Sequence, residues 1–334
     1  MALRILKEAA YSVVKTSGLM PAVRRHFAGP GAILMFHEIH TSGDAELRTG
    51  VTADFLDDLI RWLHQNAWDV LSLDDCVQRL RHPDSTKRRF AALTFDDGYR
   101  DNVQRALPVL ERHNAPFTIY IPTGAPKRTL FSWWLGLRQL FTERDSVEIE
   151  AMRCRFDTRD ASAKEAALDT VCRWIHQDYE RKAMLTSTFD KAGISLEALN
   201  DRYFMDEEEL MALSRHPLAS IGGHTSSHAA ISTLHEKAAV EEMTSNRAYL
   251  QDLLQLEIPH FAFPYGNQNA CGDRDFEIAK SVGFSSAVTT DDAPVSNRSH
   301  NMFGLPRIGI RNNDSAITFD ARISGLRKVA GRWL

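Results

Sequence analysis

Two adjacent carboxylates follow a short apolar stretch of the chain. Residues 91–95 are apolar or small, and Asp96, Asp97 and Gly98 come directly after them. We interpret residues 91–95 as a buried strand and Gly98 as the turn that ends it. Neighbouring strand residues point to opposite faces, so both carboxylates reach one site only if the turn re-aims one of them. One carboxylate could then bind a metal while the other accepts a proton. A surface turn is the alternative, because Asp-Gly is a common turn pair.

A pair of histidines has the spacing of metal ligands. His224 and His228 lie four residues apart in the stretch IGGHTSSH, residues 221–228. On one turn of helix, residues four apart share a face, so both imidazoles could reach one ion. With one carboxylate from elsewhere they would form a three-ligand site that keeps a position open for water. A lone histidine usually has a structural or surface role, but this pair together with the Asp-Asp turn favours a metal site.

A third stretch has the form of a strand that runs into a stiff turn. The sequence HFAFPYGN, residues 260–267, is apolar up to Pro264 and continues with Tyr265 and Gly266. Taken alone, it would be interpreted as a plain turn. In α/β sheets, however, ligands bind at the carboxyl ends of the strands, which is where all three stretches place their polar residues.

The surrounding sequence alternates strand and helix patterns, which implies a parallel sheet with crossover helices. Further strands are expected at residues 32–36, 70–73, 117–121, 218–221 and 285–288. Helices are expected at residues 54–65, 74–81, 102–114, 234–254 and 276–282. Pro108 is expected in a first helical turn or at a kink. Asp206 and Glu209 have the spacing of a capping box, which predicts a helix that runs to about Ser214.

Together, the three stretches resemble the polysaccharide deacetylase family, carbohydrate esterase family 4, with its NodB homology domain. TFDDG followed by His-Thr-x-x-His is specific in combination, and three further phrases fit: ILMFHEI at 33–39, SVGFSSAVTT at 281–290 and LPRI at 305–308. The resemblance implies an α/β fold, a distorted barrel of (β/α)7 type built from parallel strands. It implies a single domain over residues 1–334 with a core at about 30–310, and the residue patterns outside this core predict amphipathic helices at the ends.

The resemblance also implies an activity and the residues that perform it. The expected reaction is metal-dependent removal of N-acetyl groups from a poly- or oligosaccharide that contains N-acetylhexosamine. Asp97, His224 and His228 match the family's metal ligands, and Asp96 matches its general base. The backbone N–H of Tyr265 matches the oxyanion donor. Zinc is the expected ion, although Co²⁺, Ni²⁺ or Mn²⁺ also suit two histidines and an aspartate.

The position of the general acid in the chain departs from the usual family pattern. The family's usual histidine stands near the C-terminal end of the domain, where this chain offers only His300, in a polar stretch. His37 instead ends the first predicted strand, an order found in some exopolysaccharide-modifying relatives. We therefore predict His37 as the acid and interpret the nearby His40 as a loop residue.

A second departure concerns the arginine that orients the base in the family. Ala262 occupies its position, and we expect Arg307 to supply the charge from another strand. Because the ligand set is intact, an active enzyme is favoured over a non-catalytic carbohydrate-binding relative. A metal-dependent amidase that acts on a small non-sugar amide is the other alternative.

Residues 125–205 interrupt the alternation and are expected to be a mainly helical insertion in the family core. Three patterns occur within it: an aromatic helix at 131–141, a strand-like alternation at 147–156 and mostly helix at 161–191. Trp133 and Trp134 could stack on a sugar. We favour the interpretation that they dock the insertion onto the barrel, because aromatic side chains mostly serve as packing area.

The composition and the chain ends indicate a cytoplasmic protein. Hydrophobic residues make up 43% of the 334 residues, and the net charge of −4 argues against a general nucleic-acid binder. The four cysteines form no CxxC pair and predict neither a zinc finger nor a disulfide framework: Cys76, Cys154, Cys172 and Cys271.

No stretch approaches the roughly 20 apolar residues of a membrane span. Charged residues interrupt residues 3–17, which predict an amphipathic helix rather than a secretory signal. Residues 317–334 mix apolar and basic residues and could rest on the inner membrane face, although packing on their own domain is favoured.

Overall fold

The computed structural model describes residues 28–41, 47, 50–82, 88–295, 301–311, 314 and 316–324. The helix predicted at residues 3–17, His300 and residues 325–334 lie outside this part of the chain. The cytoplasmic location and the membrane contact of the chain ends therefore stay predictions. Among the described helices, none has the length and apolar character needed to cross a bilayer. All four cysteines are free.

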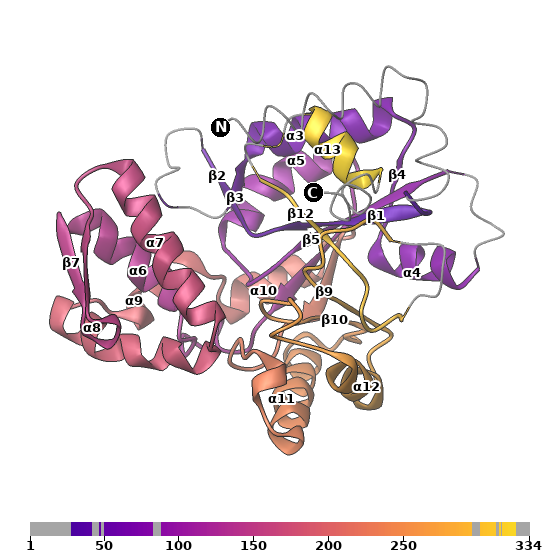
Figure 1. Cartoon of the computed structure of the whole chain (residues 1–334). Helices are drawn as coiled ribbons and strands as arrows, with labels where there is room; N and C mark the ends of the chain where they lie inside the picture. The colour runs from indigo at the N-terminus through magenta and orange to yellow at the C-terminus, as the bar shows by residue number, and fades with distance from the viewer. Residues whose placement is uncertain are drawn as a thin grey trace, which may run out of the picture.

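Parallel strands form one curled, eight-stranded sheet (Figure 1). Their order is β11-β10-β9-β6-β5-β1-β12, with the short strand β4 (Asp69–Val70) paired to β5 off this path. The bounds of the others are β1 Gly31–Phe36, β5 Phe90–Phe95, β6 Phe117–Ile121, β9 Ala219–Gly223, β10 His260–Ala262, β11 Ser286–Val288 and β12 Ile308–Gly309. Leu305 bridges Val288 of β11, and Ile308 pairs with Leu34 of β1. The segment before β12 thus links the two ends of the sheet, and the prediction of a (β/α)7-type barrel is confirmed.

Helices cover the outer side of the barrel, with α3, α5 and α13 above the sheet in Figure 1 and α11 and α12 below it. The bounds are α3 Ala53–Gln65, α5 Leu107–Arg112, α10 Glu207–Ser214, α11 Glu236–Leu254, α12 Asp273–Val282 and α13 Ala316–Ile323. Their apolar faces and the outward strand residues form one hydrophobic core, which joins Leu34 and Phe95 to Leu59 and Met243. Phe319 of α13 takes part in it, so this part of the chain end packs on the domain.

Helix α4 (Leu73–Arg81) closes the amino end of the barrel. Its Leu73 and Val77 share a second buried cluster with Ile33 of β1 and Tyr120 of β6. Successive strand residues point to opposite faces, so the same strands serve this inner cluster and the outer core. The amino end is thereby filled with side chains, and the carboxyl end is left for polar residues.

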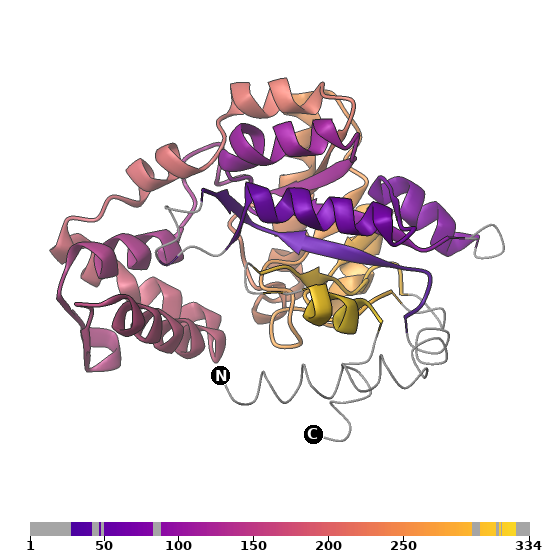
Figure 2. The same ribbon diagram turned by 90° about the horizontal axis from the view of Figure 1, so that it is seen from above.

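Residues 125–205 form a separate lobe between β6 and β9, which are neighbours in the sheet. Both views place it at one side of the barrel (Figures 1 and 2). Its elements are α6 Trp133–Glu143, β7 Ser146–Ile149, β8 Cys154–Asp157, α7 Ala161–His176, α8 Thr186–Ala192 and α9 Leu196–Tyr203. Leu137, Phe141 and Val171 belong to its own hydrophobic cluster. A buried ion pair between Arg138 of α6 and Glu38 ties the lobe to β2 (Glu38–His40), which pairs with β3 (Gly50–Thr52).

Several local predictions are confirmed. Asp206 accepts the N–H of Glu209, whose carboxylate accepts the N–H of Asp206, so the capping box is present and α10 ends at Ser214. Pro108 lies in the first turn of α5, where its missing N–H needs no partner. A π-helical turn, Asn102–Ala106, precedes this helix.

Two local predictions are wrong. Residues 147–156 form the antiparallel hairpin β7–β8 instead of one strand, because Arg153 takes a left-handed φ of 50° and reverses the chain. Alternation alone does not show such a reversal. The strand predicted at 70–73 ends at Val70, because Ser72 caps α4 by accepting the N–H of Asp75.

Candidate active site

The turn after β5 sends its two carboxylates in different directions. The Asp96 N–H donates to the carbonyl of Phe36 at 3.0 Å, which continues the pairing with β1. Asp97 then takes a φ of 73° and Gly98 a φ of 75°. A Cβ on Gly98 would lie 2.8 Å from the Ile121 side chain, so both the conformation and the space require glycine. The strand has ended and the turn re-aims Asp97, as expected from the sequence.

The histidine pair lies on a loop rather than on a helix. His224 follows the last residue of β9, and His228 has a left-handed φ of 55°. The backbone N–H groups of Ser226 and Ser227 both donate to a carboxylate oxygen of Glu242 at 2.9 Å. This carboxylate on α11 satisfies the loop's donors, so the chain folds back without a helical turn. The four-residue spacing still brings the two imidazoles together.

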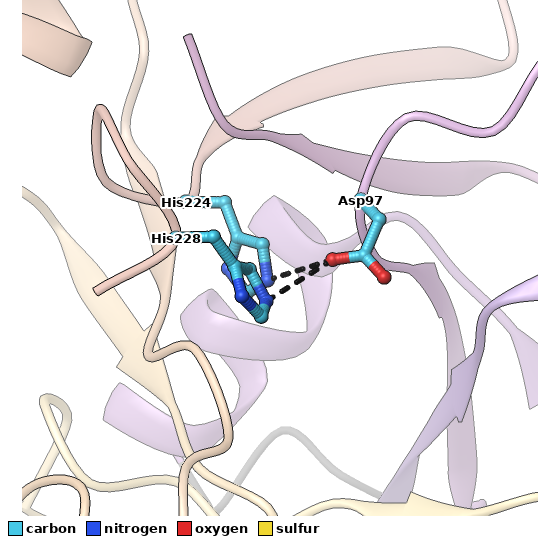
Figure 3. Close-up of side chains that lie close together, drawn as sticks. All are labelled: Asp97, His224 and His228. Atoms are coloured by element: carbon cyan, nitrogen blue, oxygen red, sulfur yellow. Dashed lines mark ion pairs between the residues drawn. The ribbon is translucent and has the colours of Figure 1, made fainter. Parts of the chain in front are cut away.

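Asp97, His224 and His228 form one buried group (Figure 3). The Oδ1 atom of Asp97 lies 3.4 Å from Nε2 of His224 and 3.3 Å from Nε2 of His228, and it is buried without a hydrogen-bond partner. His224 Nδ1 lies 2.7 Å from the carbonyl oxygen of Ala262. A carbonyl can only accept, so Nδ1 carries a proton, and in the neutral ring Nε2 keeps its lone pair. This donor set fits a divalent metal ion.

The charge state of the group also suits a metal. Burial opposes ionisation of Asp97, but the neighbouring imidazoles outweigh it and hold the pKa of the carboxyl well below its usual range. Burial lowers the pKa of His228, which favours the neutral imidazole that metals require. At neutral pH Asp97 is therefore ionised, and the His228 ring is favoured in its neutral form.

Sequence reasoning missed the residue that supports His224 from behind. The buried Asn246 of α11 accepts the His224 N–H at 2.9 Å and donates to the carbonyl of Ile121 at 3.0 Å and to Thr123 Oγ1 at 2.9 Å. Asn246 and Glu242 lie four apart on one helix face that packs under the histidine loop. Two polar residues at this spacing, 14 and 18 residues after His228 in the next long helix, are a signal that could have indicated both.

Asp96 is held by Arg307, a fully buried residue that precedes β12. Arg307 donates through Nη1 to Oδ1 at 2.6 Å and through Nη2 to Oδ2 at 2.7 Å, while its Nε donates to the carbonyl of Thr289 at 2.9 Å. Burial raises the pKa of Asp96, but Arg307 and the nearby histidines outweigh it and leave the pKa below its usual value. The guanidinium thus reaches Asp96 from the segment before β12, where the sequence predicted another strand, while Ala262 packs in the barrel interior.

His37 lies at the same rim, beside Asp96. Its Nε2 is 4.0 Å from Asp96 Oδ2, and its side chain is 34% exposed, against 4% for Asp96. His40 belongs to strand β2 and is buried, which corrects its interpretation as a loop residue. The competing His300 lies outside the described residues.

Tyr265 completes the rim from the loop after β10. Its φ is 60°, and its ring centroid lies 4.9 Å from that of His228. Thr290 Oγ1 donates to its carbonyl at 2.7 Å, whereas its own backbone N–H donates to no acceptor among the described residues. Burial raises the pKa of the Tyr265 phenol far above its usual range, so the hydroxyl stays protonated. The seven predicted site residues therefore meet at one rim.

The fold and this rim define a class: parallel α/β barrels that carry an Asp-His-His group and an arginine-bound aspartate at the carboxyl ends of the strands. The profile of the family named Polysaccharide deacetylase matches residues 84–287. The chain belongs to the polysaccharide deacetylase family. It is 20% identical over 295 residues to YxkH of Bacillus subtilis (strain 168), whose name places it among these proteins. The match covers 88% of this chain and 76% of YxkH.

Solved structures share the fold. The Streptococcus pyogenes deacetylase PplD, in complex with acetate, superposes with a TM-score of 0.59 and 17% identity over 87% of this chain and 97% of PplD. IcaB from Ammonifex degensii gives a TM-score of 0.56 and 16% identity over 89% and 97% of the chains. A de-N-acetylase from Aggregatibacter actinomycetemcomitans gives 0.56 and 12% identity over 87% and 99%.

Proposed function

We propose that this protein is a metal-dependent hydrolase that removes N-acetyl groups from a poly- or oligosaccharide containing N-acetylhexosamine. The observation that carries the proposal is the buried, unpartnered Oδ1 of Asp97, which faces Nε2 of His224 and of His228. Membership of a deacetylase family supports acetyl hydrolysis as the reaction. Deacetylation needs an activated water, a stabilised oxyanion and a proton for the leaving amine, and the rim offers a residue for each need.

In this proposal, Asp97, His224 and His228 hold the metal. Zinc is the proposed ion because it suits two imidazoles and one carboxylate, although Co²⁺, Ni²⁺ or Mn²⁺ would also fit. A divalent metal lowers the pKa of a bound water toward ~7 and polarises a carbonyl. The burial of all three side chains supports this assignment, because an uncompensated buried carboxylate is costly.

Asp96 is proposed as the general base that takes a proton from the attacking water. Arg307 binds both of its carboxylate oxygens, which fixes the direction of the carboxylate plane and keeps the group ionised at neutral pH. A base must be both unprotonated and well oriented when the water attacks. The arginine thus prepares Asp96 without touching the substrate.

The oxyanion and the leaving group are assigned to Tyr265 and His37. The backbone N–H of Tyr265, which has no acceptor in the described part of the chain, is proposed to donate to the developing oxyanion. His37 is proposed to protonate the nitrogen as the C–N bond breaks, which yields acetate and a free amine. Its partly exposed ring can exchange protons with solvent between turnovers.

Acetate release tests this proposal. The purified protein is stripped with a chelator, reloaded with Zn²⁺ and incubated with chitooligosaccharides, a polymeric N-acetylglucosamine glycan and small acetamides. We expect acetate from the N-acetylated glycans only after reloading, and none from Asp97→Ala treated in the same way. Acetate from the small amides alone would replace the proposal by a non-sugar amidase. Glycan binding without acetate release at any metal loading would indicate a non-catalytic relative.

A further inference from the structure

Two adjacent tryptophans of the 125–205 lobe contact both loops that carry the proposed catalytic groups. The indole N–H of Trp133 donates to the hydroxyl of Tyr265 at 3.1 Å. The indole N–H of Trp134 donates to the hydroxyl of Tyr99 at 2.7 Å. Tyr265 belongs to the loop after β10, and Tyr99 lies two residues after Asp97 in the turn after β5. One helical turn of α6 thus reaches both loops.

Both loops depend on their surroundings to keep their shape. Asp97 and Tyr265 take left-handed φ angles of 73° and 60°, which cost non-glycine residues free energy and persist only where neighbouring groups hold them. The lobe supplies such neighbours at each loop. The ring of Tyr265 lies 4.4 Å from that of Tyr179, and the ring of Tyr99 lies 5.0 Å from that of Phe204.

The helix that presents the two indoles is itself fixed. Ser132, directly before α6, donates through Oγ to Asn200 Oδ1 at 2.5 Å, and the Asn200 amide donates to the carbonyl of Leu130 at 2.8 Å. Further along α6, Arg138 donates to both carboxylate oxygens of Glu38, at 2.9 and 2.7 Å. These contacts fix α6 against the barrel. The two indoles can therefore hold the Tyr99 and Tyr265 side chains in place.

We propose that Trp133 and Trp134 are positioning residues of the active site, an inference that rests on the proposed function. Trp134 holds the Tyr99 turn and so sets the place of Asp97; its ring also lies 5.1 Å from that of the metal ligand His228. Trp133 holds the Tyr265 ring and so sets the place of the backbone N–H assigned to the oxyanion. The lobe then acts as a frame for the catalytic loops in addition to its packing role.

The first arm of the test measures the affinity for Zn²⁺ alone, by competition with a chromophoric chelator. Trp134→Phe keeps an aromatic ring and removes the N–H, so Tyr99 loses its buried partner, and we expect zinc to bind about tenfold more weakly. Trp174→Phe is the matched control, since the Trp174 ring of α7 lies under the Arg181 guanidinium and makes no hydrogen bond or ring contact with Tyr99 or Tyr265 in the described part of the chain. Equal zinc affinity of these two folded variants would overturn the role of Trp134.

The second arm separates kcat from KM. Trp133→Phe is expected to lower kcat roughly tenfold while KM and zinc affinity stay within about twofold, because the oxyanion donor acts mainly in the transition state. Tyr265→Phe should match it, and the double variant should be no worse than either. A lower melting temperature with unchanged kcat would make Trp133 merely structural. If the wild-type protein releases no acetate, the proposed function is wrong, whereas the zinc affinities still decide the role of Trp134.

Discussion

Among the described residues, histidine and aspartate side chains meet at both ends of the barrel, but only at the carboxyl end does a carboxylate oxygen of such a group lack a hydrogen bond. At the amino end, His260 Nδ1 lies 2.9 Å from Ser286 Oγ, and its Nε2 lies 3.1 Å from Asp74 Oδ1. At the carboxyl end, the Oδ1 of Asp97 faces two imidazoles without a hydrogen bond. At the amino end both ring nitrogens of the histidine thus have hydrogen-bond partners, whereas at the carboxyl end a buried carboxylate oxygen has none.

This difference distinguishes the group at the amino end, which has a structural role, from the group at the carboxyl end, which could bind a ligand. Ser286, His260 and Asp74 have the residue types of a nucleophilic triad, yet Ser286 and His260 are fully buried, so no substrate reaches the hydroxyl. Both ring nitrogens of His260 are used, which joins α4 to β10 and β11. Buried polar atoms normally find partners, so the buried Oδ1 of Asp97, which faces two imidazoles without a hydrogen bond, belongs to a group that could hold a metal ion.

Removing the ligands at the carboxyl end should have the largest effect. Asp97→Ala, His224→Ala and His228→Ala are each expected to lose bound metal and acetate release together, because a three-ligand site has no spare donor. Metal analysis and acetate assays measure both. His260→Ala, at the other end, should lower the melting temperature while the folded fraction keeps its metal. Stoichiometric metal and intact activity in any of the three ligand variants would remove that residue from the site.

Neutralising Asp96, the proposed base, should leave the metal content of the protein unchanged. Asp96→Asn retains the shape of the side chain but cannot take a proton, so we expect turnover to fall by roughly 10²–10⁴-fold at unchanged metal content. Near-native turnover would show that another group accepts the water's proton.

Removing the proposed acid should lower turnover less than the Asp96→Asn change does. His37→Ala is expected to lower turnover by roughly 10²-fold with normal metal binding and to remove the alkaline limb of a bell-shaped pH–rate profile. His40→Ala and His300→Ala should change little. A damaged His300→Ala enzyme beside a nearly normal His37→Ala enzyme would assign the acid to the late histidine.

Arg307 should affect the reaction by lowering the pKa of Asp96, the proposed base. In Arg307→Leu, the charge that lowers the pKa of Asp96 is gone while the burial that raises it remains, so the pKa of Asp96 should rise. Asp96 would then be protonated at higher pH, and the acid limb of kcat/KM against pH should move upward. Arg307→Lys, which keeps the charge but not the two-point contact, should lie between this variant and the wild type. An unmoved acid limb in Arg307→Leu would contradict the role of the guanidinium.

The smallest effect is expected at the amino end, on stability. The hydrogen bond from His260 is the main cause of a lowered pKa of Asp74, so this carboxylate stabilises the fold above its ordinary pKa of ~3.9, and the contribution is lost as pH falls through the lowered value. The Asp74 side chain is 61% exposed, so the contribution should be under about 1 kcal/mol. Asp74→Asn should therefore differ from the wild type in free energy of unfolding at pH 7 and converge with it below the lowered pKa of Asp74. A difference that is constant with pH would refute the contribution of this hydrogen bond.

The sequence by itself determined the features that depend on neighbouring residues. The end of β5 before Asp96, Asp97 and Gly98 follows from local sterics, and so do the capping box of α10 and the place of Pro108. Backbone conformation at such points is set by the residue and those beside it, so the pattern is sufficient. Asp97, His224 and His228, which motif spacing and family resemblance predicted as metal ligands, also meet in space.

Only the tertiary structure decided how distant parts combine. The contact between Arg307 and Asp96 spans 211 residues, and the hydrogen bond from Trp133 to Tyr265 spans 132. The histidine loop takes its form from Glu242, a residue on a later helix. Such contacts depend on which strands become neighbours and on how each loop satisfies its buried N–H groups. Residue spacing along the chain does not predict the strand neighbours or the partners of the buried N–H groups, because the packing of the whole barrel decides both.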